Sequence, residues 1–140
     1  MFTQLQQLLL QSRQFSTDYW HDCALFEAEN CLQSFQAHDW QALEQALPTQ
    51  NAYWKQRCID VLAACPSAES IAVLSLLCDD AESRTAYTAA QALLDLSRKS
   101  NLHDGIAAAL VSALDKAQTV KRKNSIFSRL QQRFFFHPAV

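Results

Sequence analysis

The sequence predicts an all-α fold, built of antiparallel helical hairpins stacked as a short solenoid or bundle of seven to eight helices. Three observations predict it. The 140 residues include one glycine and three prolines, too few glycines for the tight turns of a sheet-rich fold. Leucine, alanine and glutamine, which favour helices, are abundant. Apolar residues recur at spacings of three and four along almost the whole chain.

The first half of the chain contains four amphipathic segments. Segment 3–14 carries an apolar stripe that includes Leu5 and Leu9, and segment 16–36 begins at Ser16, a residue suited to capping a helix. Segment 39–47 is short and is followed by Pro48, and segment 52–65 is followed by Pro66. Because proline cannot continue a helix, both prolines support the predicted ends.

The second half contains four more segments, at 68–78, 81–99, 104–117 and 120–135. Ser67 is placed to cap the first of them, and Asp79 and Asp80 are placed to separate and cap the next. The links between segments are short, which favours antiparallel neighbours. None is long enough to mark a boundary, so we expect a single helical domain over residues 1–140.

The charge is unevenly distributed. Residues 1–115 carry 6 Lys/Arg and 14 Asp/Glu, a net charge of −8, whereas residues 116–140 carry 6 Lys/Arg and no acid. The acidic body is expected to attract a basic partner through its long-range field. The basic segment suits contact with nucleic acid, acidic lipid or the acidic body itself, and a simple solvated face remains the alternative for both.

The sequence contains no recognisable catalytic or metal-binding pattern. The four histidines lack ligand spacing, and a chain with one glycine has no Gly-rich phosphate loop. The odd number of cysteines, five, without a CxxC pair suits reduced thiols packed on apolar stripes. No signal peptide or membrane-spanning stretch is recognisable. We therefore expect a cytoplasmic protein that is not an enzyme, with no cofactor, no metal and no membrane partner.

One stretch shows order beyond amphipathicity: it reads Leu74-x-x-Leu77-x-Asp79-Asp80-x-x-x-Arg84-x-x-Tyr87-x-Ala89-Ala90-x-Ala92-Leu93-x-x-Leu96. This pattern of helix, acidic turn and alanine-rich helix resembles the HEAT repeat. Fainter copies precede it around Arg57 and follow it around Arg122, so the resemblance covers about residues 39–130. It implies that Arg84 pairs with Asp79 or Asp80. A plain helical bundle remains the alternative.

A narrower resemblance rests on Tyr53-Trp54-x-x-Arg57-Cys58-x-x-Val61-Leu62, followed by Asp79-Asp80-x-x-x-Arg84. This composite is similar to the small HEAT-like immunity proteins of bacterial toxin–immunity systems, including contact-dependent growth inhibition and other polymorphic toxins. The resemblance implies a cytoplasmic protein that binds and blocks one cognate toxin domain, often a nuclease. A nuclease active site is basic because it holds phosphate, so an acidic inhibitor face would complement it.

The candidate partner-binding residues are exposed acids and tyrosines on the repeat helices and turn: Tyr53, Asp60, Asp79, Asp80, Glu82, Tyr87 and Asp95. Asp60 and Asp95 are expected to be exposed, because the opposite faces of their helices are apolar. Helix capping is the competing interpretation for the acidic turn, and burial at a helix start for Tyr53.

Two other functions stay open at this point. One is a helical adaptor or scaffold that uses a repeat groove or the aromatic segment Phe134–Phe136, which either caps the last repeat or is an exposed docking segment. The other is an RNA-binding module led by the basic segment, with Lys121, Arg122, Lys123, Arg129 and Arg133. The negative body makes nucleic acid the less favoured partner, because it repels phosphate.

Overall fold

The all-α prediction is confirmed. The structure, a computed structural model, describes residues 1–99 and 104–135, and these ranges contain helices and turns but no strand. Its elements are α1 (Phe2–Gln11), a 3₁₀ turn η1 (Ser12–Gln14), α2 (Thr17–Tyr19), a π-helical turn η2 (Trp20–Ala24), α3 (Leu25–Gln33), α4 (Ala37–Ala46), a 3₁₀ turn η3 (Leu47–Thr49), α5 (Ala52–Ala64), α6 (Ala68–Leu77), α7 (Ser83–Ser97) and α8 (Asp104–Phe135).

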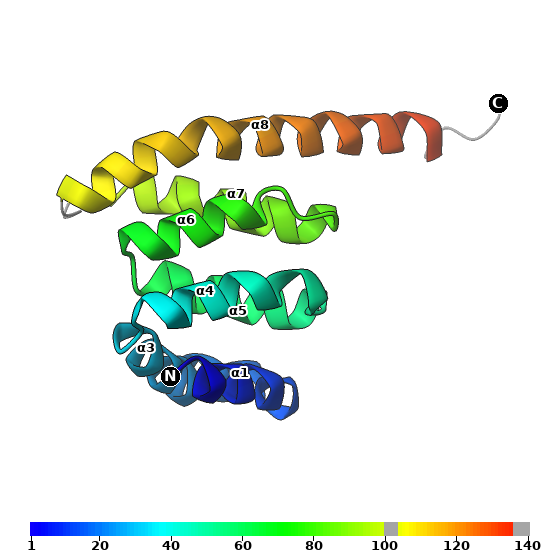
Figure 1. Cartoon of the computed structure of the whole chain (residues 1–140). Coiled ribbons are helices and arrows are strands. Elements are labelled where there is room, and N and C mark those ends of the chain that lie inside the picture. The colour runs from blue at the N-terminus through cyan, green and yellow to red at the C-terminus, as the bar shows by residue number, and fades with distance from the viewer. Residues whose placement is uncertain (100–103, 136–140) are drawn as a thin grey trace.

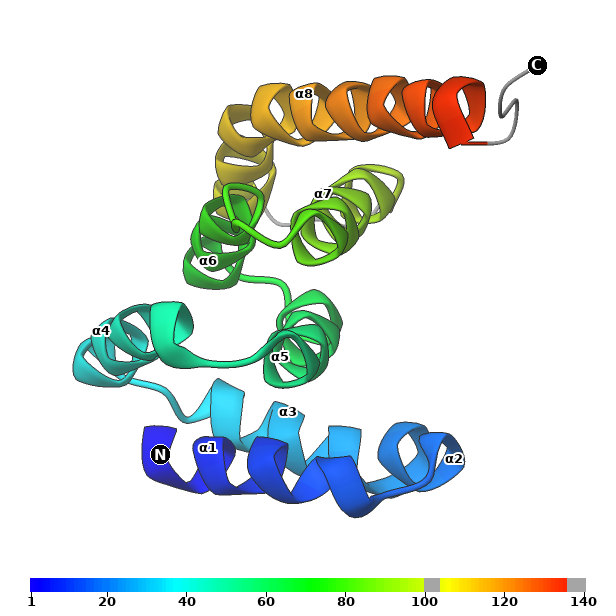
Figure 2. The same cartoon turned by 90° about the vertical axis from the view of Figure 1, so that its right-hand side faces the viewer.

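The helices form a stack of layers (Figure 1). α1 and α3 make the first layer, α4 and α5 the second, and α6 and α7 the third, with α8 across the far end. Figure 2 shows two rows, with α4 and α6 on one side and α5 and α7 on the other. Along one row α3 contacts α5 and α5 contacts α7, while α8 packs on both α6 and α7. The arrangement agrees with the predicted stacking of helical pairs.

Local side-chain caps explain where several helices begin. The Asn51 side chain accepts a hydrogen bond from the Trp54 N–H at 2.8 Å at the start of α5. Ser67 and Ser70 bond each other's backbone N–H groups at the start of α6. Each cap satisfies N–H groups that have no partner within the helix. The cap predicted for α7 is wrong: Glu82, rather than Asp79 or Asp80, accepts from the first N–H groups of that helix.

The predicted break between segments 104–117 and 120–135 is also wrong, because α8 is one helix of 32 residues. The link between the two segments, Gln118 and Thr119, contains neither glycine nor proline, so nothing stops the helix. The buried stripe Leu110, Ala113 and Ala117 holds the first half of α8 against the stack. The interpretation of the Phe134–Phe136 segment rests on residues whose side chains lie outside the described part of the structure.

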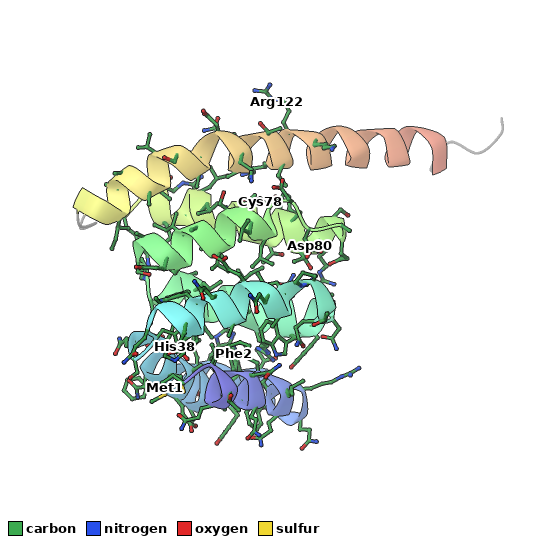
Figure 3. All side chains as sticks on the ribbon, viewed as in Figure 1. Met1, Phe2, His38, Cys78, Asp80 and Arg122 are labelled. Carbon is green, nitrogen blue, oxygen red and sulfur yellow. The ribbon has the colours of Figure 1, made fainter. Side chains whose placement is uncertain are left out.

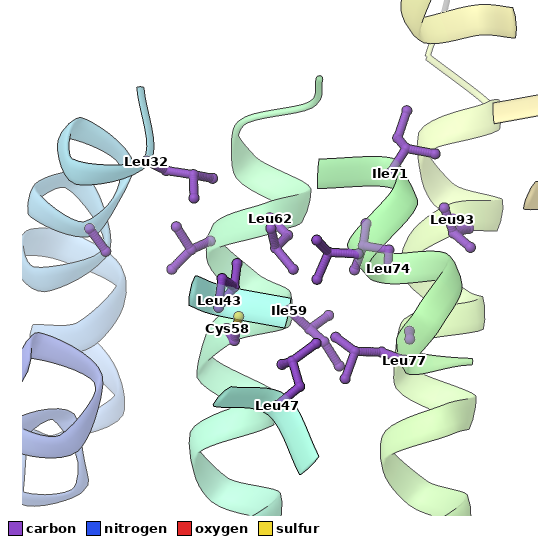
Figure 4. Close-up of a cluster of buried hydrophobic side chains, with 14 of the residues drawn as sticks. Leu32, Leu43, Leu47, Cys58, Ile59, Leu62, Ile71, Leu74, Leu77 and Leu93 are labelled. Carbon is purple, nitrogen blue, oxygen red and sulfur yellow. The ribbon is translucent and has the colours of Figure 1, made fainter. Parts of the chain in front are cut away.

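The core runs through the layers and is centred on α5 (Figure 4). This helix buries five side chains: Trp54, Cys58, Ile59, Val61 and Leu62. All five cysteines are free, and Cys58 and Cys78 are buried on apolar faces as expected. Cys23 is exposed, which corrects the expectation for that residue.

Membrane insertion finds no support in the helices: none in the described ranges is both long enough and apolar enough to span a bilayer.

Asp39 ties the start of the chain to α4. Its carboxylate accepts from the Gln36 N–H at 2.9 Å, which caps α4, and from the Phe2 N–H at 3.1 Å. The Met1 amino group lies 3.5 Å away, and Figure 3 shows Met1 and Phe2 near His38, the neighbour of Asp39. The backbone hydrogen bond from Gln36, assisted by the one from Phe2, lowers the pKa of Asp39.

We predict that Asp39→Asn destabilises the protein at neutral pH, because the variant loses the charge and one acceptor. The lowered pKa sets the sign of the pH dependence. The stabilisation is present above the unfolded aspartate pKa of about 3.9 and is lost as the pH falls through the lower folded pKa. Melting temperatures of wild type and variant should therefore converge in acid, with Glu44→Gln, an exposed change on the same helix, as the control. A constant difference at every pH would contradict the assignment.

Candidate functional site

An open groove of about 350 Å³ lies between α5 and α7. Three of the seven predicted contact residues, Asp60, Tyr87 and Asp95, are brought together along it. Thr88, Gln91 and Lys99 also line it, so its polar groups are two carboxylates, a phenol, a hydroxyl, an amide and one cation. These groups offer hydrogen bonds and charge to a partner that fills the groove.

The α7 side of the groove is a row of residues spaced four apart, Tyr87, Gln91 and Asp95, which share one helix face. Tyr87 is 39% exposed. The Asp95 side chain is 58% exposed, as expected from the sequence. Gln91 donates to the Asp95 carboxylate at 2.9 Å, and Arg98 lies 3.6 Å from it. Both contacts lie at the surface and are easily exchanged for contacts with a partner.

Asp60 forms part of the α5 wall, but the expectation that it is freely exposed is wrong. Its side chain is 36% exposed and accepts a hydrogen bond from the Trp20 indole N–H at 3.0 Å. Burial raises the pKa of Asp60, while the bond from Trp20 and the nearby Arg57 charge oppose the shift. Asp60 therefore fastens α5 to the π-helical turn η2 and presents only part of its carboxylate to the groove.

Tyr53 has an internal role next to Asp60. The Arg57 guanidinium lies 4.7 Å from the centre of the Trp20 ring and 5.1 Å from that of Tyr53. It donates to the Tyr53 hydroxyl at 2.9 Å, and that hydroxyl donates to the Ser12 carbonyl at 2.9 Å. Tyr53 is thus half-buried, in line with the competing interpretation, and does not line the groove. Sequence reasoning missed Trp20 and Ser12 here, because no local spacing links them to α5.

The acidic turn between α6 and α7, which contains Asp79, Asp80 and Glu82, does not line the α5–α7 groove. Asp80, whose side chain is 11% exposed, pairs with Lys55 of α5 at 2.5 Å, and Asp79 pairs with Lys116 of α8 at 2.8 Å. The expected pairing of Arg84 with these aspartates is wrong, because Arg84 is exposed and forms no ion pair with the described carboxylates. Asp80, which belongs to this turn, is labelled in Figure 3. A cavity of about 670 Å³ lies between the turn and α8, away from the α5–α7 groove.

Glu82 of the same turn acts mainly as a cap. Its carboxylate accepts from the Arg84 and Thr85 N–H groups, at 3.2 and 3.0 Å, and from the Thr85 hydroxyl. The Thr85 hydroxyl contributes most to lowering the pKa of Glu82, so the carboxylate stays charged at the positive end of the α7 dipole. Capping therefore accounts for Glu82.

The groove contains no cysteine, and the buried thiols elsewhere are inert. Burial raises the pKa of Cys58 to about 12 and that of Cys78 to about 11, so both remain protonated at physiological pH. In the part of the chain that the structure describes, no group of three or more His, Cys, Asp or Glu residues is placed to hold a metal ion.

Comparisons with known proteins found no family model, no curated protein and no solved structure that matches this chain. The geometry of the groove is therefore the basis for the function proposed below.

We predict that Lys55→Ala lowers the free energy of unfolding by about 1–3 kcal/mol, because it leaves the largely buried Asp80 carboxylate without its cation. Arg84→Ala should change it by less than about 0.5 kcal/mol, since its side chain is exposed. Urea denaturation of both variants measures the difference. A larger loss for Arg84→Ala would restore the pairing that the HEAT resemblance implies.

We also predict that Tyr53→Phe lowers the free energy of unfolding by about 1–3 kcal/mol, because the Ser12 carbonyl and the Arg57 guanidinium lose their shared partner. The matched control is Tyr87→Phe, which removes the hydroxyl of an exposed tyrosine and should have little effect. Denaturation curves compare the two variants. Equal changes in the free energy of unfolding would show that the Tyr53 hydroxyl does not stabilise the fold.

Proposed function

We propose that this chain is an immunity protein that binds a basic toxin domain in the cytoplasm and blocks its active site by occlusion. The observation that carries the proposal is the open α5–α7 groove, in which Tyr87 and Asp95 are exposed and Asp60 forms part of the wall. The resemblance of residues 53–84 to HEAT-like immunity proteins supplies the class of partner.

The chemistry of the groove fits a cationic partner surface. Asp95 is available to accept from an arginine or lysine of the partner, and an arginine bound there would lie within reach of the Tyr87 ring face. Tyrosine is also one of the residues that contribute most at protein interfaces. A side chain inserted from the toxin would thus find one aromatic contact and carboxylates in the same groove.

The charge of the body supports fast association. Asp18, Asp22, Glu27, Glu44 and Glu69 are exposed and form no ion pair within the described part of the chain. Their field attracts a basic surface before contact is made. If the toxin is a nuclease, its phosphate-binding active site is such a surface, and an acidic protein seated over it excludes the nucleic acid.

The groove also suits a helical adaptor that binds a basic segment of a protein other than a toxin. The two functions differ in one observable: only an immunity protein protects cells from the toxicity of its partner. If a neighbouring gene encodes a secreted protein with a variable C-terminal domain, the test is expression of that domain, alone and together with this chain. Growth arrest by the domain and rescue by the chain would support immunity. Arrest without rescue would reject it.

We predict that the double variant Tyr87→Ala and Asp95→Lys loses rescue and weakens binding to that toxin domain by about 100-fold or more, as expected for a disrupted interface centre. Glu44→Lys is the control, because it makes the same change of charge at an exposed site on α4, in the other row of helices. Asp60 and Glu82 are unsuitable for this test, because both bind other parts of the fold. If the double variant bound as tightly as the control, the groove would not be the contact.

Binding kinetics at several salt concentrations test the electrostatic part. The association rate should fall as salt rises, because the Debye length shrinks from about 10 Å at 0.1 M to about 3 Å at 1 M. Dissociation should change less, because it depends on contacts within the groove. An association rate that does not depend on salt would remove steering from the mechanism.

A further inference from the structure

The two ends of the stack carry opposite charge. α8 lies across one end, and the layer of α1, α2 and α3 forms the other (Figures 1 and 2). Residues 116–135, in α8, contain 6 Lys/Arg and no acid, whereas residues 16–30, which run from α2 into α3, contain 4 Asp/Glu and no Lys/Arg. A stack that is basic at one end and acidic at the other is complementary to a second copy of itself.

The basic end is available for contact. Figure 1 shows the C-terminal half of α8 extending past the ends of α6 and α7, and Figure 3 shows Arg122 pointing away from the rest of the stack. Arg122 and Lys123 are exposed and Lys121 is half-buried. None of the three forms an ion pair with a described carboxylate. Three adjacent basic residues, of which Arg122 points outward, therefore lie at this end without an ion pair to a described carboxylate.

The acidic end combines charge with exposed aromatic surface. Phe26 is 66% exposed and Tyr19 is 50% exposed, which makes them the two most exposed aromatic side chains among the described residues. Asp18, Asp22 and Glu27 lie beside them in the chain, and all three are exposed without an ion pair in the described ranges. Exposed aromatic residues surrounded by charge are typical of a surface that binds another protein.

We propose that the C-terminal half of α8 of one copy docks on the α2–α3 face of a second copy, in a head-to-tail contact. The two helical segments are also similar in length. At a rise of 1.5 Å per residue, residues 121–135 span about 22 Å and residues 17–33 about 25 Å. Because the two patches are different, each bound copy keeps one free patch, and further copies add to give a chain or a ring.

This contact uses neither α5 nor α7, so it is independent of the proposed function. Its test is sedimentation velocity of the full-length chain over a wide range of protein concentration, at low and at high salt. At low salt the average mass should rise with concentration beyond that of a dimer. High salt should shift the distribution toward the monomer, because the paired charges are exposed and screened.

Two charge-reversal variants test the two patches separately. The basic-end variant is Lys121→Glu, Arg122→Glu and Lys123→Glu, and the acidic-end variant is Asp18→Lys, Asp22→Lys and Glu27→Lys. Each should associate with itself about tenfold or more weakly, since three exposed ion pairs turn repulsive. In an equimolar mixture the two intact patches are complementary to each other, and so are the two reversed patches, so the mixture should regain the assembly that each variant alone has lost.

The matched control for the basic-end variant is Arg84→Glu, Arg98→Glu and Lys99→Glu, which makes the same change of net charge on α7 and directly after it and should leave assembly intact. Circular dichroism checks folding. Should a triple variant fail to fold, the single changes Arg122→Glu and Phe26→Ser, both at exposed side chains, take its place.

A wild-type chain that stays monomeric at every concentration would overturn the proposal. It would also be overturned if the mixture of the two variants stayed monomeric, or if the α7 control lost assembly to the same extent. In that last case net charge rather than docking would control association.

Discussion

The structure depends on the packing of α5, which contacts α1, α3, α6 and α7. A helix with neighbours on this many sides has little surface left for water, and α5 accordingly buries both members of two adjacent pairs, Cys58–Ile59 and Val61–Leu62. A charged residue on such a helix needs either a hydrogen-bond or ion-pair partner or contact with solvent. Asp60 has both, since it bonds the Trp20 indole and also lines the groove toward α7. The groove between α5 and α7 is thus the place where the packing of α5 leaves part of the Asp60 carboxylate in contact with solvent.

The same constraint explains why the cations of α5 have internal partners. Arg57 lies between two aromatic rings, and Lys55 reaches Asp80 in the turn after α6. Each contact joins α5 to a different layer, toward η2 on one side and toward the α6–α7 turn on the other. In a stack where each layer touches only its neighbours, such contacts fix how one layer is rotated on the next. The groove geometry is set by these contacts as well as by the apolar core.

Sequence reasoning succeeded where the signal was local and failed where it was not. Pro48, Pro66 and Ser67 mark helix boundaries because their effects act within one turn. The apolar face of α7 likewise predicts that Asp95, on the opposite face, is exposed. The partners of the turn aspartates were missed because Lys55 and Asp80 are 25 residues apart and Lys116 and Asp79 are 37 apart. No spacing rule reaches that far. The break expected within α8 depends on the polar residues at 118–119, and a solvent-facing turn of a continuous helix has the same composition.

The carboxylates of this chain fall into two groups, and the division matters for how acidity is used. Asp39, Asp60, Asp80 and Glu82 accept hydrogen bonds or ion pairs within the fold, so their oxygens are largely occupied. The second group is exposed and forms no ion pair in the described ranges: Asp18, Asp22, Glu27, Glu44 and Glu69. A long-range field counts every charge, whereas a contact needs free acceptor oxygens. The long-range attraction of the proposed basic partner therefore depends on both groups of carboxylates, whereas specific contacts need the free oxygens of the second group. The carboxylate of Asp95 has only surface contacts, with Gln91 and Arg98, and it lies beside an aromatic ring in an open groove. In the proposed function it therefore adds direction to an attraction that the whole body supplies.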